Sequence, residues 1–73
     1  MKEIINFLKE HKHFKNPNIS SNLVFEPLEV NEKEKKIKVN CIDQVTGYSH
    51  VETWDDFDIT ISAFLIGEYQ FIG

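Results

Sequence analysis

Hydrophobic and polar residues repeat with different periods along this chain, and the first period is that of a helix. Within residues 2–13, apolar side chains from Ile4 to Leu8 fall at the i, i+1 and i+4 positions of one face, while charged and amide side chains occupy the other. We expect an amphipathic helix that ends near Phe14, because Pro17 disfavours the helical conformation of the residue before it.

Three segments with the character of β-strands follow this helix. Residues 23–30 contain Pro27, which cannot donate a hydrogen bond to a ladder and therefore predicts an edge strand or a bulge. Residues 36–42 alternate between polar and apolar side chains, which is typical of a strand with one buried face. Residues 48–54 form a third strand after a five-residue loop that ends at Gly47. Together they predict a three-stranded antiparallel meander.

A trial register pairs these strands so that apolar residues meet apolar residues and opposite charges meet. In the first hairpin Val30 faces Ile37, and in the second Ile42 faces Tyr48. The face that we expect to carry the core holds Leu28, Val30, Ile37, Val39, Cys41 and Val51. The other face either binds a partner or is covered by a helix or a second subunit. It holds Glu29, Lys36, Lys38, Asn40, Tyr48, His50, Glu52 and Trp54.

The last apolar run follows three aspartates and is compatible with two structures. As a helix it has Asp55 as its N-cap and Asp58 three residues later, and it ends at Gly67. The core stripe of this helix holds Phe57, Ile61, Phe64 and Leu65. As a strand, the run has suitable alternation and β-branched residues. The capping residues favour the helix. We therefore expect one α+β domain, residues 1–73, with the order αβββα; a fourth strand in place of the last helix (αββββ) is the alternative.

Size and composition limit what this domain can be. A chain this short buries about 60% of its unfolded surface, so its six Phe, two Tyr and one Trp must supply much of the core. The single cysteine, Cys41, excludes an internal disulfide. Early charges are unlike a signal peptide, and the run that ends at Ile66 is shorter than the ~20 residues of a membrane span. We expect a soluble, cytoplasmic protein.

The net charge of −4 is unevenly distributed along the chain. All eight lysines precede residue 40, and there is no arginine, so the first forty residues carry a charge of +2 and the remainder carries −6. Nucleic-acid binders normally show a basic face rich in arginine. This balance makes nucleic acid an improbable partner and favours a protein with a basic surface.

The acidic cluster of Glu52, Asp55, Asp56 and Asp58 has more than one interpretation. It can imitate nucleic-acid phosphates in front of a basic partner, or bind a divalent cation. Alternatively, the acids gather there because the positive end of a helix favours them. The spacing lacks the alternating ligands, central glycine and terminal glutamate of a calcium loop. We expect no calcium site there.

Other candidate chemistry is sparse. His11 and His13 are two residues apart and point to opposite sides of the predicted helix. His50 shares a strand face with Glu52, whereas the trial register directs Cys41 to the opposite face, so the thiol and the imidazole do not meet. The chain contains no Gly-Xaa-Ser-Xaa-Gly elbow, no phosphate-binding loop and no His-Glu-Xaa-Xaa-His motif. We expect no enzyme, no cofactor and no metal site.

The leading hypothesis is a non-catalytic protein-binding module, in the style of a small phage- or mobile-element-encoded inhibitor, that docks its acidic C-terminal half on a basic, nucleic-acid-handling protein. The candidate partner-binding residues are Tyr48, His50, Glu52, Trp54, Asp55, Asp56 and Asp58. One alternative is a single-stranded nucleic-acid binder that stacks bases on Tyr48 and Trp54 beside Lys36 and Lys38. The other is a structural subunit that forms a homodimer through its aromatic face.

Overall fold

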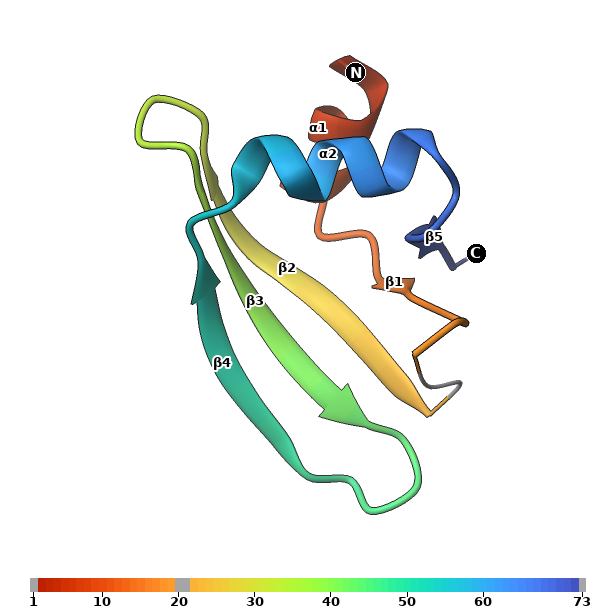
Figure 1. Ribbon diagram of the computed structural model, residues 1–73. Helices are drawn as coiled ribbons and strands as arrows, with labels where there is room; N and C mark the ends of the chain where they lie inside the picture. Colours follow the sequence, from red (N-terminus) through yellow and green to blue (C-terminus); the bar gives the residue numbers. More distant parts are fainter. Residues whose placement is uncertain (1, 20–21, 73) are drawn as a thin grey trace.

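The computed structural model describes residues 2–19 and 22–72, which form two helices and a five-stranded antiparallel sheet (Figure 1). The elements are α1 (Lys2–Lys9), β1 (Phe14–Lys15), β2 (Leu23–Asn31), β3 (Lys36–Asp43), β4 (Ser49–Trp54), α2 (Phe57–Leu65) and β5 (Gln70–Phe71). The strand order across the sheet is β4-β3-β2-β1-β5. The α+β class, the helix near each end and the central meander are confirmed. The αβββα description is incomplete, because β1 and β5 extend the sheet beyond β2.

The first helix is shorter than its periodicity predicts. It ends at Lys9, because His11 adopts a left-handed backbone conformation with φ of 63°. The chain then turns, and Phe14 enters β1 between Phe25 of β2 and Phe71 of β5. Phe14 therefore belongs to the sheet, and the residues before Pro17 are not the end of a helix.

The core is built around the ring of Phe14, which has no solvent-exposed surface. Five aromatic rings lie with their centroids 5.0–6.3 Å from it, and they come from four different parts of the chain. These rings are those of Phe25, Trp54, Phe64, Tyr69 and Phe71. Leu8, Ile37, Val39, Cys41, Phe57 and Ile61 complete the buried cluster. Aromatic burial in this quantity compensates for the small size of the domain.

In β2, Pro27 marks a bulge, as its chemistry predicts. The register of β2 with β3 shifts between Pro27 and Glu29, so Val39 faces Pro27 rather than Leu28. After the shift, toward the turn into β3, the predicted pairing of Val30 with Ile37 is confirmed. The expectation of an edge strand is wrong, because β2 lies between β1 and β3.

The predicted register of the second hairpin is wrong by one residue. Ile42 pairs with Ser49, and Cys41 therefore pairs with His50. The loop explains the shift: the Asp43 side chain accepts hydrogen bonds from the amides of Val45 and Thr46 at 2.9 and 3.2 Å. A further bond, from the Asp43 amide to the Tyr48 carbonyl at 2.8 Å, closes the loop. A shift of one residue moves each side chain of a strand to the other face of the sheet. The side chains of β4 therefore lie on the faces opposite to those predicted.

We call the sheet face that carries Ile37, Val39 and Cys41 the core side, and the face that carries Lys36, Lys38 and Asn40 the outer side. His50, Glu52 and Trp54 belong to the core side, since they pair with Cys41, Val39 and Ile37. Val51 pairs with Asn40 on the outer side and is 55% exposed, so its predicted place in the core is wrong.

The apolar run after the aspartates is helix α2, so the fourth-strand alternative is wrong. Asp56, rather than Asp55, occupies the N-cap position, and Gly67 ends the helix with φ of 85°, as expected. Phe57, Ile61 and Phe64 pack toward the core, whereas Leu65 is 60% exposed and does not belong to the buried stripe. Neither helix in the described ranges has the length and apolar character needed to cross a membrane.

Candidate functional site

The β3–β4 hairpin extends away from the two helices, which pack at the opposite end of the sheet (Figure 1). The molecule is correspondingly elongated, with principal extents of 34 × 23 × 20 Å. In β4, every residue from Ser49 to Thr53 is exposed, and only Trp54 is partly buried. β4 is also an edge strand, because β3 is its single neighbour in the sheet order. This strand is the most accessible part of the sheet.

On the core side of β4, three side chains are joined by hydrogen bonds through Glu52. The Nε2 atom of His50 lies 2.7 Å from Glu52 Oε2, and the Trp54 Nε1–H donates to Glu52 Oε1 at 3.0 Å. These bonds, first that from Trp54 and then that from His50, lower the pKa of the Glu52 carboxyl. Both oxygens of this exposed carboxylate are therefore held in place.

Cys41 lies directly across the ladder from His50, with 5% of its surface exposed. Its Sγ, a ring nitrogen of His50 and a carboxylate oxygen of Glu52 all lie within 4.8 Å of one another. The expectation that the thiol and the imidazole point to opposite faces is therefore wrong. Burial, and then the charge and hydrogen bond of Glu52, raise the pKa of Cys41 to about 11. A protonated thiol is a poor nucleophile.

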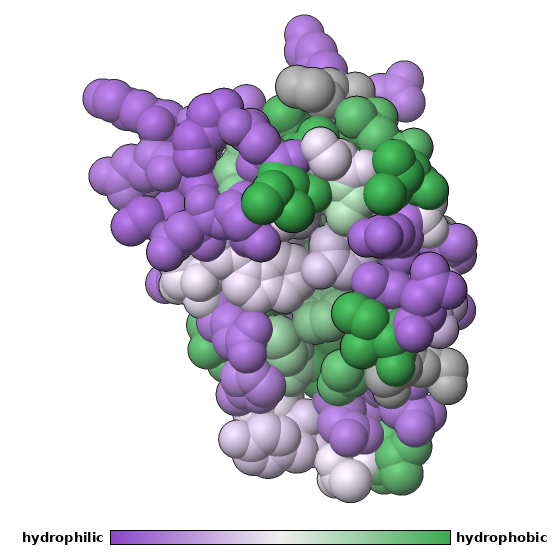
Figure 2. All heavy atoms as spheres, viewed as in Figure 1, coloured by the Kyte–Doolittle hydropathy of each residue, from purple (hydrophilic) through white to green (hydrophobic). Residues whose placement is uncertain are grey.

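The acids that are close together in sequence, Glu52, Asp55, Asp56 and Asp58, have different neighbours in the folded protein. Asp55 lies 4.0 Å from the Nζ of Lys36, and Asp58 lies 3.4 Å from the Nζ of Lys35. Those two lysines stand at the end of the turn between β2 and β3. Figure 2 shows hydrophilic side chains gathered over this turn, next to hydrophobic side chains over α2. The uneven charge along the sequence is thus partly balanced by the fold.

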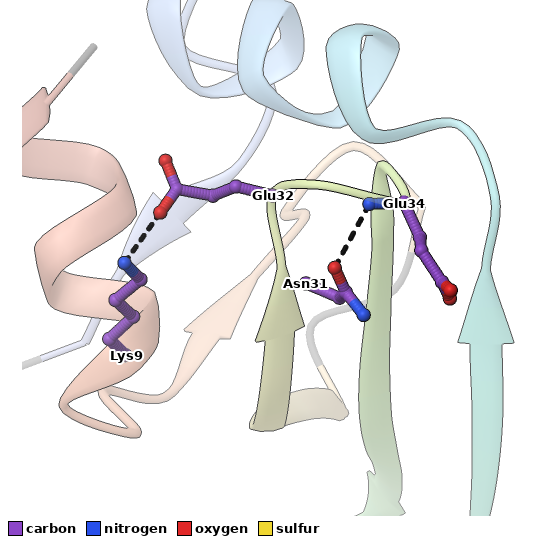
Figure 3. A network of polar contacts seen from close by, with 4 residues as sticks. All are labelled: Lys9, Asn31, Glu32 and Glu34. Atoms are coloured by element: carbon purple, nitrogen blue, oxygen red, sulfur yellow. Dashed lines mark hydrogen bonds and ion pairs between the residues drawn. The ribbon is translucent and has the colours of Figure 1, made fainter.

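The turn that supplies these lysines is held by its own polar contacts. The Asn31 side chain accepts a hydrogen bond from the Glu34 amide at 2.9 Å, and the Lys9 ammonium donates to Glu32 and ties the turn to α1 (Figure 3). Lys35 completes the turn with φ of 60°. Sequence periodicity does not reveal the pairs of Lys9 with Glu32 and of Lys35 with Asp58, because the two members of each pair are 23 residues apart in the sequence.

Glu52 and Asp56 differ from Asp55 and Asp58 in having no lysine nearby in the described structure. The charge of Asp56, after burial, helps to raise the pKa of Tyr69, which stacks with Trp54 at a centroid distance of 6.0 Å. Glu52 lies on the same side of the sheet as Trp54. Within residues 2–19 and 22–72, no lysine lies within ion-pair distance of either acid. Glu52 pairs with His50 instead, and Asp56 accepts a hydrogen bond from Thr60 Oγ1 at 3.5 Å, so neither carboxylate is neutralised by a lysine.

The predicted aromatic face does not form as expected. Tyr48 is 67% exposed, and its ring lies 5.8 Å from that of His50, but Trp54 packs its ring against Phe25 and the core. Lys38 projects from the outer side, where it lies 3.9 Å from Glu29. The predicted grouping of the two aromatics with Lys36 and Lys38 on one face is therefore wrong.

The histidines of the first segment also lie apart from this site. His11 Nδ1 lies 2.8 Å from the Pro27 carbonyl, and His13 Nε2 lies 4.0 Å from Glu26. Both contact β2 rather than the β3–β4 hairpin. Comparisons with protein-family models, curated proteins and solved structures found no match for this chain. The functional interpretation therefore depends on the geometry described above.

Proposed function

We propose that this protein is a non-catalytic protein-binding module that takes a basic, extended segment of a partner along the edge of β4. The observation that carries the proposal is an exposed edge strand, Ser49–Trp54, with the carboxylate of Glu52 on it and that of Asp56 two residues beyond it, neither of them paired with a lysine of the described residues. Edge strands present unpaired backbone groups that pair readily with another strand.

The loop hydrogen bond determines which backbone groups of β4 are available. In an antiparallel ladder, hydrogen-bonded and non-hydrogen-bonded pairs alternate. The Asp43 amide bonds the Tyr48 carbonyl, so the pairs of Cys41 with His50 and of Val39 with Glu52 are hydrogen-bonded. The amides and carbonyls of the residues between them, such as Val51, therefore point away from β3. A partner strand would bond to these groups.

Charge decides the chemistry of the partner. The chain carries a net charge of −4, and the two carboxylates of the acidic cluster that have no lysine partner, Glu52 and Asp56, lie on or just after β4. A lysine or arginine of the incoming segment would pair with them, and Tyr48 would supply an exposed aromatic contact. Asp55 and Asp58 contribute less to this surface, because each lies near a lysine of its own chain.

A proline at the outward-facing amide tests the edge directly. Random peptides displayed on a surface are selected for binding to the protein in the presence of a chelator, and the affinity of the best peptide is measured. We expect selected peptides to be rich in lysine and arginine. Val51→Pro removes an outward donor and should weaken binding about tenfold or more, whereas Val51→Thr keeps the donor and should bind as the parent does.

The outcomes separate the hypotheses. Equal peptide affinity in Val51→Pro and Val51→Thr, with both variants folded by circular dichroism, would overturn edge binding. Selection of acidic or uncharged peptides would overturn the basic partner. A concentration-dependent dimer in sedimentation that Val51→Pro abolishes would favour the structural-subunit hypothesis instead.

The proposal extends to the biological setting. A small acidic module that binds a basic segment suits an inhibitor of a nucleic-acid-handling protein, of the kind that phages and mobile elements encode. A reducing compartment such as the cytoplasm suits the free thiol of Cys41.

A further inference from the structure

We propose that Cys41, His50 and Glu52 form a zinc-binding site with a fourth position open to solvent. Thiolate, imidazole and carboxylate are the three ligand types that zinc takes in proteins. Calcium and magnesium prefer oxygen ligands alone, so this donor set disfavours them. The site shares Glu52 with the proposed peptide-binding surface but goes beyond it, because Cys41 and His50 have no part in binding a partner strand.

The ladder brings the three donors together. Cys41 and His50 form a directly opposed pair of β3 and β4, and Glu52 follows His50 at the next position on the same face. The three ligand atoms lie within 4.8 Å of one another. Tetrahedral zinc with bonds of 2.0–2.3 Å holds its ligand atoms roughly 3.3–3.5 Å apart. On zinc binding, rotation of the exposed His50 and Glu52 side chains toward Cys41 would close that difference.

A hydrogen bond behind the site orients the carboxylate. Trp54 Nε1 donates to Glu52 Oε1 at 3.0 Å and leaves Oε2 directed at His50, 2.7 Å away. Ligating carboxylates in metal sites are commonly held by such an outer hydrogen bond. Zinc would replace the hydrogen bond between His50 Nε2 and Glu52 Oε2, and the proton of that bond would leave Nε2 for solvent or for the other ring nitrogen. The Cys41 thiol would release its proton to the solvent on binding.

Access and charge are also suitable. Cys41 forms a buried floor, whereas the side chains of His50 and Glu52 are 45% and 47% exposed, so an ion can reach the donors from solvent. The lysines nearest in the ladder, Lys36 and Lys38, project from the other side of the sheet. Neither of these lysines therefore faces the proposed zinc ion.

The test uses the full chain in reduced form, titrated first with Co²⁺ as a coloured substitute for zinc. We expect one ion per chain, the absorption of tetrahedral Co²⁺ and a thiolate-to-cobalt charge-transfer band, all removed by adding Zn²⁺. A shift in the emission of Trp54, the only tryptophan in the sequence, should follow the same titration.

Variants identify the ligands. His50→Gln and Glu52→Gln change exposed side chains and should each weaken Zn²⁺ binding at least tenfold, while Cys41→Ser should remove the charge-transfer band. His13→Gln is the matched control, since His13 also lies near a glutamate, Glu26, but outside this group. A missing charge-transfer band in the reduced parent, or equal Zn²⁺ affinity in His50→Gln and His13→Gln, would overturn the site. Peptide binding is measured with a chelator present, so the two proposals fail independently.

Discussion

Cys41 of β3 and His50 of β4 lie directly opposite each other on the side of the sheet that carries the core. A register shifted by one residue would separate them onto different faces. The loop from Asp43 to Tyr48 determines this register, because the Asp43 side chain bonds two loop amides and its own amide closes the loop. The site on the core side and the free edge of β4 both follow from these few bonds.

The loop therefore offers the first prediction. Asp43→Ala removes the acceptor of the Val45 and Thr46 amides and should lower the free energy of unfolding by about 1 kcal/mol. Asp43→Asn keeps an acceptor and should cost less. Urea unfolding gives the stability, and amide hydrogen exchange of β4 reports the pairing. Unchanged exchange in Asp43→Ala would show that the rest of the ladder holds the register alone.

The aromatic core gives the second prediction. Phe14 is fully buried and contacts five rings, so Phe14→Ala should cost about 3–5 kcal/mol. That loss is comparable to the whole stability of many small domains, and we expect the variant to be largely unfolded. Near-ultraviolet circular dichroism measures the loss of fixed aromatic packing. Phe7→Ala, at a ring that is 37% exposed, serves as the control and should remain folded.

The third prediction concerns the paired aspartates. Asp58→Asn removes an exposed ion pair with Lys35 and should change stability by less than about 1 kcal/mol. It should also leave the affinity for a basic peptide nearly unchanged, whereas Glu52→Gln and Asp56→Asn should weaken it. Fluorescence anisotropy with a labelled peptide at moderate salt compares the three variants. Equal losses in all of them would show that the acids act as one undivided cluster.

The fourth prediction is a loss of stability in alkaline solution. Burial first, and then the nearby Glu52, raise the pKa of Cys41 from 9.0 to about 11 in the folded protein. The protonated thiol is thus favoured by folding, so its contribution is complete below pH 9 and is lost as the pH rises through 11. The total loss should reach roughly 2–3 kcal/mol. Cys41→Ala should flatten the dependence of unfolding free energy on pH between 9 and 11; an identical slope in this variant would contradict the prediction.

Local signals in the sequence predicted those parts of the fold that depend on neighbouring residues. The alternation of residues 36–42, the break at Pro27 and the glycine at the end of the last helix each act within a few residues. The structure accordingly contains β3, a bulge beside Pro27, and α2 ending before Gly67. The first helix was predicted too long, because the left-handed conformation of His11 and the pairing of Phe14 in β1 leave no mark on helical periodicity.

The sequence placed most of the candidate partner-binding residues on or next to one strand, but it assigned that strand's side chains to the wrong face of the sheet. His50, Glu52 and Trp54 of β4 lie on the core side of the sheet rather than the face shared with Lys36 and Lys38, and Tyr48 in the loop before β4 lies beside His50. Three of the four residues chosen as an acidic cluster follow one another closely in sequence, but the fold directs them to different neighbours.

The sequence by itself thus determined the class of the fold, the positions of its main strands and helices, and the net acidity of its second half, because these depend on local spacing and on composition. The tertiary structure alone decided which side of the sheet β4 presents, and it did so through the hydrogen bonds of one short loop. It also decided which aspartates pair with lysine, since the lysine partners of Asp55 and Asp58 come from a turn that is distant in sequence. For that reason Cys41 and His50, assigned to opposite faces from the sequence, became neighbours in the folded protein.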